Sequence, residues 1–364
     1  MTENHLIRRH FLLTTNRTEE TAIWTFAELG VADLLEAANT PQTADELAQK
    51  QGWNSDYLYR LLRAVADANI VREIKYNEAI ELEKTNRFEL TKDGRYLTSD
   101  HPSKLRYSLR AWFHPVIQTA SQYLPQLIRD GSSKGSGVER VTGNVPIFEF
   151  LKKEENREFA HNFNEAMASH SRCSREIVVN AINFSRFNKI VDIGGGLGCL
   201  LSYILEKNPT IKQGVCFDLP QVMQQSDIEN EFVKQNLSKD RYQLVGGDMF
   251  DPKTIPQADA YILQNIIHNW SDDQAIDIIK SIRKAANGQQ VTLFIIEVMV
   301  ISDIEQNKFL SRIVHAMDLQ MMIILNGKER TQKQHEYLFE QSGFKFKRLY
   351  VTGTPHSIIE AVSN

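Results

Sequence analysis

The sequence predicts an α/β protein, with a doubly wound, mostly parallel sheet in its second half and a smaller, mostly helical part before it. Strand-like and helix-like segments alternate from residue 188 onward, which is typical of a sheet covered by helices on both faces. The first of these strands, residues 189–193, is a β-branched run that enters a glycine turn. Residues 18–91 instead read as helices followed by two short β-like runs.

Length and composition bound the class of protein. A chain of 364 residues with 42% hydrophobic and 24% charged residues is typical of a globular protein of about two domains. A net charge of -4 gives no general attraction to nucleic acid or to anionic lipid. The cysteines fit neither a disulfide framework nor a metal-ligand spacing, and no signal peptide or membrane span is evident. We therefore expect a cytoplasmic protein without a metal.

The N-terminal part is expected to contain a helix over residues 18–37 and a second helix after Thr43, which opens a near capping box. A third helix begins near Asn54, and β-like runs follow around 69–75 and 86–91. This order suggests a winged helix, which either binds DNA or serves a structural, dimerising role. Acidic residues outnumber basic ones over 43–90, so the charge favours dimerisation.

The middle of the chain is predicted to be helical over 103–129 and 147–183, with a mobile glycine- and serine-rich loop at 131–137. In the second stretch Phe163, Met167 and His170 fall on one side, and Ser171 lies next to them. Two interpretations are open. The helix is packed with one polar edge, or it bridges two domains and closes over a ligand.

The second half is predicted to supply the sheet. Its expected strands are 189–193, 214–218, 242–248, 258–263, 291–297, 344–351 and 357–362, the last antiparallel to 344–351 at the edge of the sheet. Ligands bind at the carboxyl ends of the strands in such sheets. Polar residues at these ends, Asp218, Asp248, His268 and Glu297, are therefore candidates for a site.

The glycine turn after the first strand differs from a dinucleotide fingerprint, because Cys199 stands where a third glycine is needed. Asp218 could accept both hydroxyls of a ribose or cap the helix at Pro220. Asp248 and Met249 suit a flat adenine ring, or they form a core turn. Two interpretations of the glycine turn stay open: it binds a nucleotide-like molecule, or it is a plain tight turn without a ligand.

Two further positions carry candidate acid–base chemistry. His268 follows a strand and precedes a capping box at Ser271 to Gln274, so it is either a catalytic base or a buried structural histidine. Glu329 precedes a helix with its own box at Thr331 to Gln334, and it either serves the site or favours the start of that helix. Met317 and Met321 lie on a predicted helix over 309–325, as an adaptable apolar wall or as core.

The segments VDIGGGLG, FDLPQV, GDMF, IIHNWSDD, IIE and GKERT occur in this order behind the winged-helix-like part. This combination resembles the small-molecule O-methyltransferases that use S-adenosylmethionine, of the caffeic acid, hydroxyindole and bacterial polyketide-tailoring types. The resemblance implies a class I methyltransferase fold with a seven-stranded Rossmann-like sheet and a homodimer. It divides the chain into a dimerisation domain (1–102), a helical linker with the bridging helix (103–185) and a cofactor-binding catalytic domain (186–364).

The resemblance also implies residue roles. His268 is the expected general base, flanked by Glu297 and Glu329, since a phenol that titrates near pH 10 needs a base at neutral pH. The expected cofactor-binding residues are Asp192, Gly194, Gly196, Asp218, Leu219, Asp248, Met249, Gln264, Trp270 and Ser171. The expected substrate-binding residues are Met167, Phe163, Met317, Met321 and Asn326.

The expected acceptor is an aromatic hydroxyl, such as that of a phenol or a polyketide or anthraquinone-like natural product. This chain departs from the family pattern at Asn269, where many members have aspartate, and at Gln264, where plant members have lysine. The segment before Gly327 is also shorter than in plant enzymes. Because some relatives use the same fold and cofactor for hydroxylation, decarboxylation or pericyclic steps, non-methylating chemistry is the main alternative.

Overall fold

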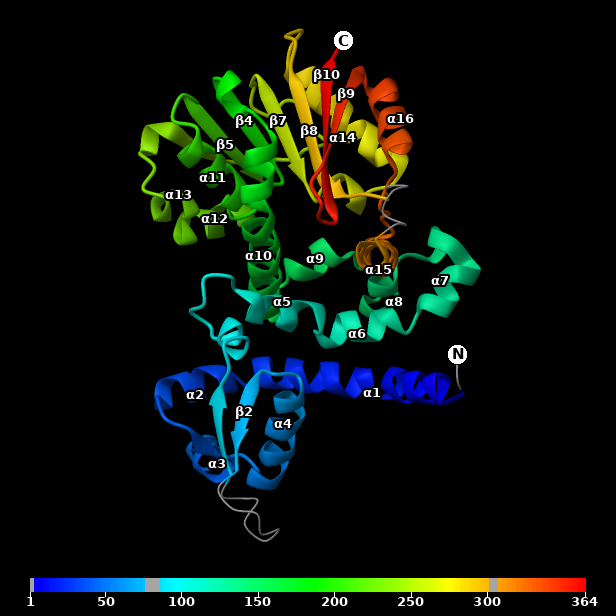
Figure 1. Cartoon of the computed structure of the whole chain (residues 1–364). Coiled ribbons are helices and arrows are strands. Elements are labelled where there is room, and N and C mark those ends of the chain that lie inside the picture. Colours follow the sequence, from blue (N-terminus) through cyan, green and yellow to red (C-terminus); the bar gives the residue numbers. More distant parts are fainter. Residues whose placement is uncertain (1–2, 76–85, 301–306) are drawn as a thin grey trace. The chain divides into compact units, whose positions relative to one another are not determined.

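The computed structural model describes residues 3–75, 86–300 and 307–364, and it divides into two compact units (Figure 1). The first unit comprises residues 1–114 and 158–169, and the second comprises 115–157 and 170–364. The long helix α10 (Arg157–Ala181) contributes its first half to one unit and its second half to the other. The functional boundaries at 102 and 185 stay predictions.

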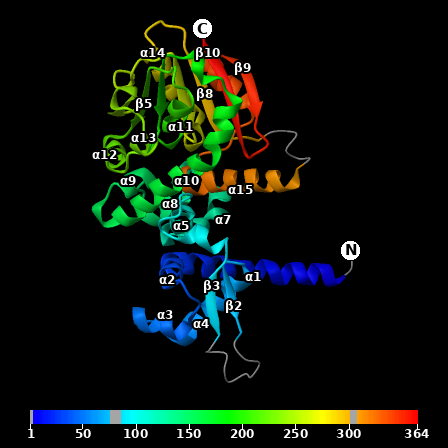
Figure 2. The ribbon, with the colours of Figure 1, turned by 60° about the vertical axis from the view of Figure 1, so that its left-hand side comes forward.

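The first unit packs short helices on a small antiparallel sheet of order β1-β3-β2. Phe26, Leu62 and Phe88 are fully buried in its core. Its elements are α1 (Glu3–Glu28), α2 (Val31–Ala38), β1 (Gln42–Thr43), α3 (Ala44–Gln51), α4 (Ser55–Asp67), β2 (Val71–Ile74), β3 (Arg87–Leu90) and α5 (Leu105–Trp112). In both views the first half of α1 extends beyond this sheet (Figure 2).

The predicted succession of helices and a β-hairpin is confirmed here, and the near capping box at Thr43 is complete, with Thr43 and Glu46 bonding each other's backbone N–H groups. The expected single helix over 18–37 is wrong. The chain breaks at Gly30, which has a φ of 67°. Glycine reaches this left-handed conformation without steric cost, so α2 starts in a new direction. Part of the interval between the β-like runs lies outside the described residues.

The stretch 103–129 is three helices where the sequence predicts one: α5, α6 (Pro115–Ser121) and α7 (Leu124–Asp130). Pro115 and Pro125 explain the breaks, because proline fits the first turn of a helix and disrupts its interior. Residues 131–134 of the glycine- and serine-rich run form a 3-10 turn, and Ser136 caps α8 (Gly137–Thr142) through a box with Glu139. Helix α9 (Ile147–Leu151) precedes α10.

The second unit contains the predicted seven-stranded sheet, with the order β6-β5-β4-β7-β8-β10-β9. Its strands are β4 (Lys189–Ile193), β5 (Gln213–Asp218), β6 (Tyr242–Gly246), β7 (Ala260–Gln264), β8 (Thr292–Val298), β9 (Phe344–Val351) and β10 (His356–Ser363). The first five are parallel, and β10 is antiparallel to both of its neighbours. The last strand was expected at the edge of the sheet, but it lies between β8 and β9, which is itself the edge strand.

Helices cover both faces of the sheet, as a doubly wound fold requires. On one face α14 (Asp272–Ala285) and α16 (Gln332–Ser342) bury apolar side chains that include Ile279 and Phe339. The other face is covered by the second half of α10 and by α11 (Cys199–Lys207), α12 (Pro220–Glu229) and α13 (Glu231–Lys234). This packing fixes the carboxyl ends of β4, β5, β7 and β8 along one edge.

Helix α15 (Lys308–Leu325) lies beside α8 in both views of the second unit (Figures 1 and 2). The two helices approach closely: a Cβ added at Gly137 would lie 2.9 Å from the carbonyl oxygen of Ile323. The bounds of α15 confirm the predicted helix over 309–325. None of the described helices is long and apolar enough to cross a lipid bilayer.

Candidate active site

The glycine turn after β4 is held by backbone hydrogen bonds to β5. The amides of Gly194 and Gly195 donate to the carbonyl of Phe217, at 2.8 and 3.2 Å. Gly194 and Gly196 have φ values of 70° and 54°, which favour glycine. A side chain at Gly194 would meet Ile266, whereas a Cβ at Gly196 would meet no atom within 4 Å. The backbone of Gly196 is therefore open to a neighbouring molecule.

Asp218, at the end of β5, fixes this turn. One carboxylate oxygen accepts a hydrogen bond from the amide of Gly196 at 3.0 Å, and the other accepts from Leu219 at 2.7 Å. Each carboxylate oxygen has a second lone pair, so Asp218 can still accept hydrogen bonds from a ligand. The two roles that the sequence leaves open, local cap and ligand acceptor, are thus compatible.

The edge of the sheet carries two acidic groups in close proximity. Burial raises the pKa of Asp192 to about 8, and the neighbouring charge of Asp218 adds to the effect. Burial also raises the pKa of Asp218, although the two backbone hydrogen bonds oppose this. A bound cation would relieve the repulsion between the carboxylates, so the site favours a positively charged ligand.

The carboxyl end of β6 leads to an aromatic corner. Asp248 is exposed and accepts a hydrogen bond from the amide of Phe250 at 2.9 Å. The rings of Phe250 and Trp270 meet edge to face at 5.0 Å, and Met249 packs on the same core. The buried indole Nε1 of Trp270 has no hydrogen-bond partner among the residues that the structure describes. A buried donor of this kind indicates an unfilled polar contact.

Ser171 and Gln264 are brought together by α10 and β7. The Ser171 hydroxyl donates to the Gln264 side-chain oxygen at 2.9 Å, and the Gln264 amide donates to Ser174 at 3.0 Å. A lysine, which the resemblance leads us to expect at this position in plant enzymes, has no acceptor atom for Ser171. Gln264 therefore links β7 to α10 through both its side-chain oxygen and its side-chain nitrogen.

The candidate base His268 lies in the 3-10 turn Ile267–Asn269 after β7, with only 6% of its surface exposed. Its ring Nδ1 lies 3.0 Å from Oε1 of Glu329, and its backbone amide donates to Oε1 of Glu297 at 2.9 Å. The structure therefore brings together all three residues proposed for acid–base chemistry. A carboxylate at Nδ1 assigns the ring hydrogen to that atom and leaves Nε2 free to accept a proton.

Burial and charge oppose each other in this cluster. Burial lowers the pKa of His268, but the hydrogen bond and charge of Glu329 and the charge of Glu297 outweigh it, so the pKa is raised overall. Burial raises the pKa of Glu297 to about 6. Burial lowers the pKa of His335, whose Nε2 lies 3.8 Å from Oε2 of Glu297, to about 3.

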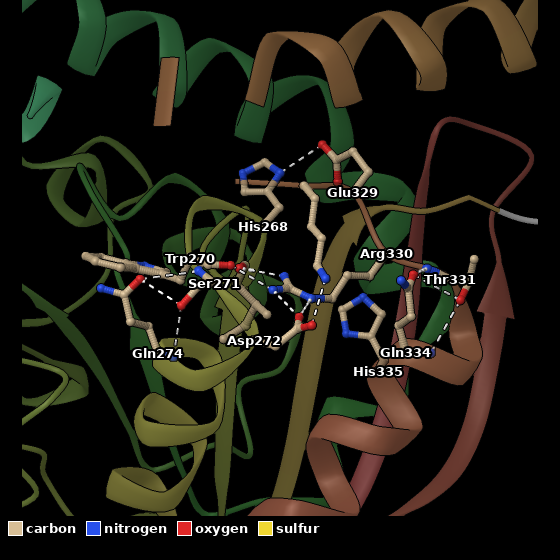
Figure 3. A network of polar contacts seen from close by, with 12 residues as sticks. His268, Trp270, Ser271, Asp272, Gln274, Glu329, Arg330, Thr331, Gln334 and His335 are labelled. Atoms are coloured by element: carbon tan, nitrogen blue, oxygen red, sulfur yellow. Dashed lines mark hydrogen bonds and ion pairs between the residues drawn. The ribbon is translucent and has the colours of Figure 1, made fainter. Parts of the chain in front are cut away.

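Sequence reasoning missed the residues that surround this cluster, of which Figure 3 labels Asp272, Arg330 and His335. The fully buried guanidinium of Arg330 contacts Asp272 and the backbone of the His268 turn. Asn265, with a φ of 54°, places its side-chain oxygen 3.1 Å from Nε2 of His356. Asp272 and Arg330 belong to the segments IIHNWSDD and GKERT, but the sequence does not show that the two residues pair.

The expected substrate residues are spread over both units. Phe163 and Met167 belong to the first unit, where Phe163 packs on Trp112 and Phe159. Their role opposite His268 stays a prediction. On α15, Met321 is buried and Met317 packs beside Val298 and Val314. Asn326 ends α15 with a φ of 57°, and its amide donates to Glu139 at 3.1 Å.

Within the described ranges no three histidine, cysteine, aspartate or glutamate side chains gather as metal ligands would. The site does fit S-adenosylmethionine. Asp192 and Asp218 suit its positive charge, Gly196 presents an open backbone, and the unpaired Nε1 of Trp270 lies on the aromatic corner. The acid–base cluster and the candidate cofactor residues thus lie at the same edge of the sheet.

Comparison with known proteins gives two family matches. Residues 122–345 match the O-methyltransferase domain, and residues 16–100 match the O-methyltransferase dimerisation domain. The phenazine O-methyltransferase PhzM of Lysobacter antibioticus is 30% identical over 344 residues, which cover 93% of this chain and 91% of that protein. The fold is also found in solved structures. The crystal structure of LaPhzM has a TM-score of 0.85 at 29% identity and covers 99% of both chains. CalO1, a methyltransferase in calicheamicin biosynthesis solved in its SAH-bound form, has a TM-score of 0.75 at 26% identity over 100% of both chains.

Proposed function

Because this chain belongs to the O-methyltransferase family and is an S-adenosylmethionine-dependent enzyme, we propose that it methylates a hydroxyl group of an aromatic small molecule. In this proposal His268 is the general base. The observation that carries the proposal is the hydrogen bond between His268 Nδ1 and Glu329, at 3.0 Å in a buried setting. It orients the ring and leaves Nε2 as the proton acceptor.

The residues around His268 support proton transfer from an acceptor hydroxyl. A phenol is protonated at neutral pH, and Nε2 would take its proton as the oxygen attacks. The imidazolium that forms is stabilised by Glu329 at Nδ1, in the way that an aspartate supports histidine in a serine-protease triad. Glu297 fixes the backbone amide of His268 and adds negative charge nearby.

The cofactor is held, in this proposal, by the glycine turn and the carboxyl ends of β4, β5 and β6. Asp218 accepts the ribose hydroxyls, and Asp248 and Met249 border the adenine. Asp192, whose pKa burial raises to about 8, ionises when the positively charged cofactor binds beside it. The rest of the proposed cofactor site is lined by Leu219, Gln264, Trp270 and Ser171. When bound, S-adenosylmethionine supplies a methyl group on a sulfonium, which is already activated for transfer.

The acceptor is proposed to be flat and apolar with a hydroxyl group, in the manner of a hydroxyphenazine or a polyketide-derived aromatic. Support comes from the similarity to the phenazine O-methyltransferase and from the methionines of α15, since thioether side chains adapt to flat apolar surfaces. Phe163, Met167 and Asn326 are proposed to border the acceptor as well.

The test is a labelled-methyl assay with hydroxyphenazine, 1-naphthol and a 4'-hydroxyisoflavone as acceptors, read as S-adenosylhomocysteine formed and as label in the product. We expect transfer to at least one acceptor, and a loss of at least 100-fold in His268→Ala. Glu340→Gln, on the exposed side of α16, is the control. Equal rates in wild type and His268→Ala would contradict the mechanism. Consumption of the acceptor without label in the product would indicate the non-methylating alternative.

The N-terminal part is proposed to form a homodimer, which the matching dimerisation domain supports. Static light scattering at micromolar concentration should give twice the mass of the chain, 41.8 kDa. A monomer at that concentration would contradict the proposal.

A further inference from the structure

The segment Gly327–Arg330 wraps the turn that carries His268. A Cβ added at Gly327 would lie 2.0 Å from the carbonyl oxygen of His268, so the chain passes as close as a glycine permits. The next amide, that of Lys328, donates to the same carbonyl at 2.9 Å. Glu329 then bonds the ring, and Arg330 bonds the turn on either side of the histidine. Four consecutive residues therefore contact one short turn.

Arg330 makes the most extensive of these contacts (Figure 3). Its Nη1 donates to the carbonyl of Ile267 at 2.9 Å, and its Nη2 donates to the carbonyl of Trp270 at 2.7 Å. Its Nε donates to Oδ1 of Asp272 at 2.9 Å. The two carbonyls stand immediately before His268 and two residues after it, so one rigid guanidinium spans the turn.

Asp272 holds the guanidinium in this position. The aspartate is the first residue of α14 and also accepts from Lys328 at 2.7 Å. Burial raises its pKa, but the hydrogen bonds from Lys328 and Arg330 outweigh this and keep the pKa low. The side chain of Arg330 is fully buried, while that of Asp272 is 42% exposed. Among the described residues, Asp272 is the only carboxylate that forms an ion pair with this guanidinium.

The turn has little support of its own. Two backbone hydrogen bonds close it, from Asn269 to Ile266 and from Trp270 to Ile267, both at 3.1 Å, and the Asn269 side-chain amide donates to the carbonyl of Asn265 at 3.2 Å. A short 3-10 turn closed by these few bonds does not fix a side chain to the accuracy that proton transfer requires. Glu297 and Lys328 bond the backbone of His268 itself, and Arg330 bonds the carbonyls of Ile267 and Trp270 on either side of it.

We propose that Arg330 is a positioning residue for the His268 base, and that Asp272 holds the guanidinium of Arg330 in place. The proposal rests on the proposed function for the identity of the base. Lysine would not replace Arg330, because its single ammonium cannot span two carbonyls and a carboxylate in the fixed geometry of a guanidinium.

The first test needs no substrate. Hydrogen exchange of the full-length protein is measured on peptides that cover 265–271 and 327–330, with β4 and β5 as internal references. In Arg330→Met we expect exchange to be at least tenfold faster in these two segments and unchanged in the reference strands. Arg330→Lys should give an intermediate increase. Wild-type protection of the turn in Arg330→Met, or equal loss in β4 and β5, would overturn the proposal.

The matched control is Arg186→Met, which also removes a cation from a buried carboxylate, Glu360, but leaves that carboxylate bonded to Lys347 and Tyr350. It should leave exchange at the His268 turn unchanged. A shared increase in both variants would mean that Arg330 only supports the fold.

The second test separates the positioning role from the proposed function. With hydroxyphenazine as acceptor, Arg330→Met should lower kcat 10- to 100-fold near neutral pH, leave S-adenosylmethionine affinity within twofold, and recover part of the loss as pH rises and the acceptor ionises. A loss that is equal at all pH values would overturn the positioning role. Absence of methyl transfer by the wild type would instead overturn the proposed function and leave the exchange result to decide the proposal.

Discussion

Replacing Glu329 with glutamine is the sharpest test of the proposed base, because it keeps the size of the side chain and removes its charge. In the wild type the carboxylate oxygen lies 3.0 Å from His268 Nδ1, and both side chains are almost completely buried. A glutamine could donate its own NH₂ to Nδ1. The imidazole hydrogen would then move to Nε2, where it blocks proton acceptance.

The magnitude follows from the distance. Two opposite charges 3.0 Å apart interact by about 5.5 kcal/mol at an effective dielectric constant of about 20. This interaction stabilises the imidazolium that forms as the acceptor loses its proton. About 1.4 kcal/mol corresponds to a tenfold change in rate, so the full interaction sets a ceiling of about 10⁴-fold. We expect Glu329→Gln to lower kcat by about 10²- to 10⁴-fold.

The assay is methyl transfer to hydroxyphenazine as a function of pH, with Glu340→Gln as the control for loss of an exposed carboxylate. Glu329 helps to raise the pKa of His268, so the variant should also move the acidic limb of the kcat profile to lower pH. The loss should shrink as the acceptor ionises at high pH. An unchanged kcat, or an acidic limb that stays in place, would refute the reasoning.

Three further predictions concern the turn and the cofactor edge. Gly327→Ala should lower the free energy of unfolding by at least 2 kcal/mol in urea titrations, since the new methyl group would overlap the His268 carbonyl; Gly52→Ala, whose Cβ meets no atom within 4 Å, should cost only about 1 kcal/mol. Asp218→Asn should weaken S-adenosylmethionine binding by about 10- to 100-fold in calorimetry, because the amide has only one acceptor oxygen for Gly196 and Leu219, and an unchanged affinity would exclude Asp218 from the site. Asp192 has a pKa of about 8 in the folded protein, against about 4 when unfolded, so it favours folding at low pH and loses that contribution as pH rises from 4 through 8; Asp192→Asn should remove this part of the pH dependence, which unfolding at pH 5 and pH 8 would detect.

Much of the fold was predictable because its signals are local. The β-branched run of β4, the glycine turn, and the capping boxes at Thr43, Ser271 and Thr331 each depend on a few adjacent residues. The proximity of His268 and Glu297 was also predictable, because the carboxyl ends of parallel strands lie at one edge of the sheet.

The parts that sequence reasoning missed depend on long-range pairing. Nothing near Ser357 distinguishes an edge strand from one inserted between β8 and β9, because either position buries one face of the strand. The contact of Arg330 with Asp272 and with the carbonyls of Ile267 and Trp270 joins residues about 60 positions apart. The break at Gly30 was missed for another reason: apolar periodicity continues across it although the backbone turns.

The insertion of β10 between β8 and β9 also constrains the order in which the protein folds. Strand β9 pairs with β10 alone, so it cannot join the sheet before β10 has docked on β8. That docking closes a loop of about 60 residues that includes α15 and α16, and the chain entropy of this closure is lost before the contacts form. In the finished register Ser357 lies opposite Glu297. The strand end that carries Glu297 is therefore fixed on one side by β10, and we expect activity to return during refolding only after β10 has docked.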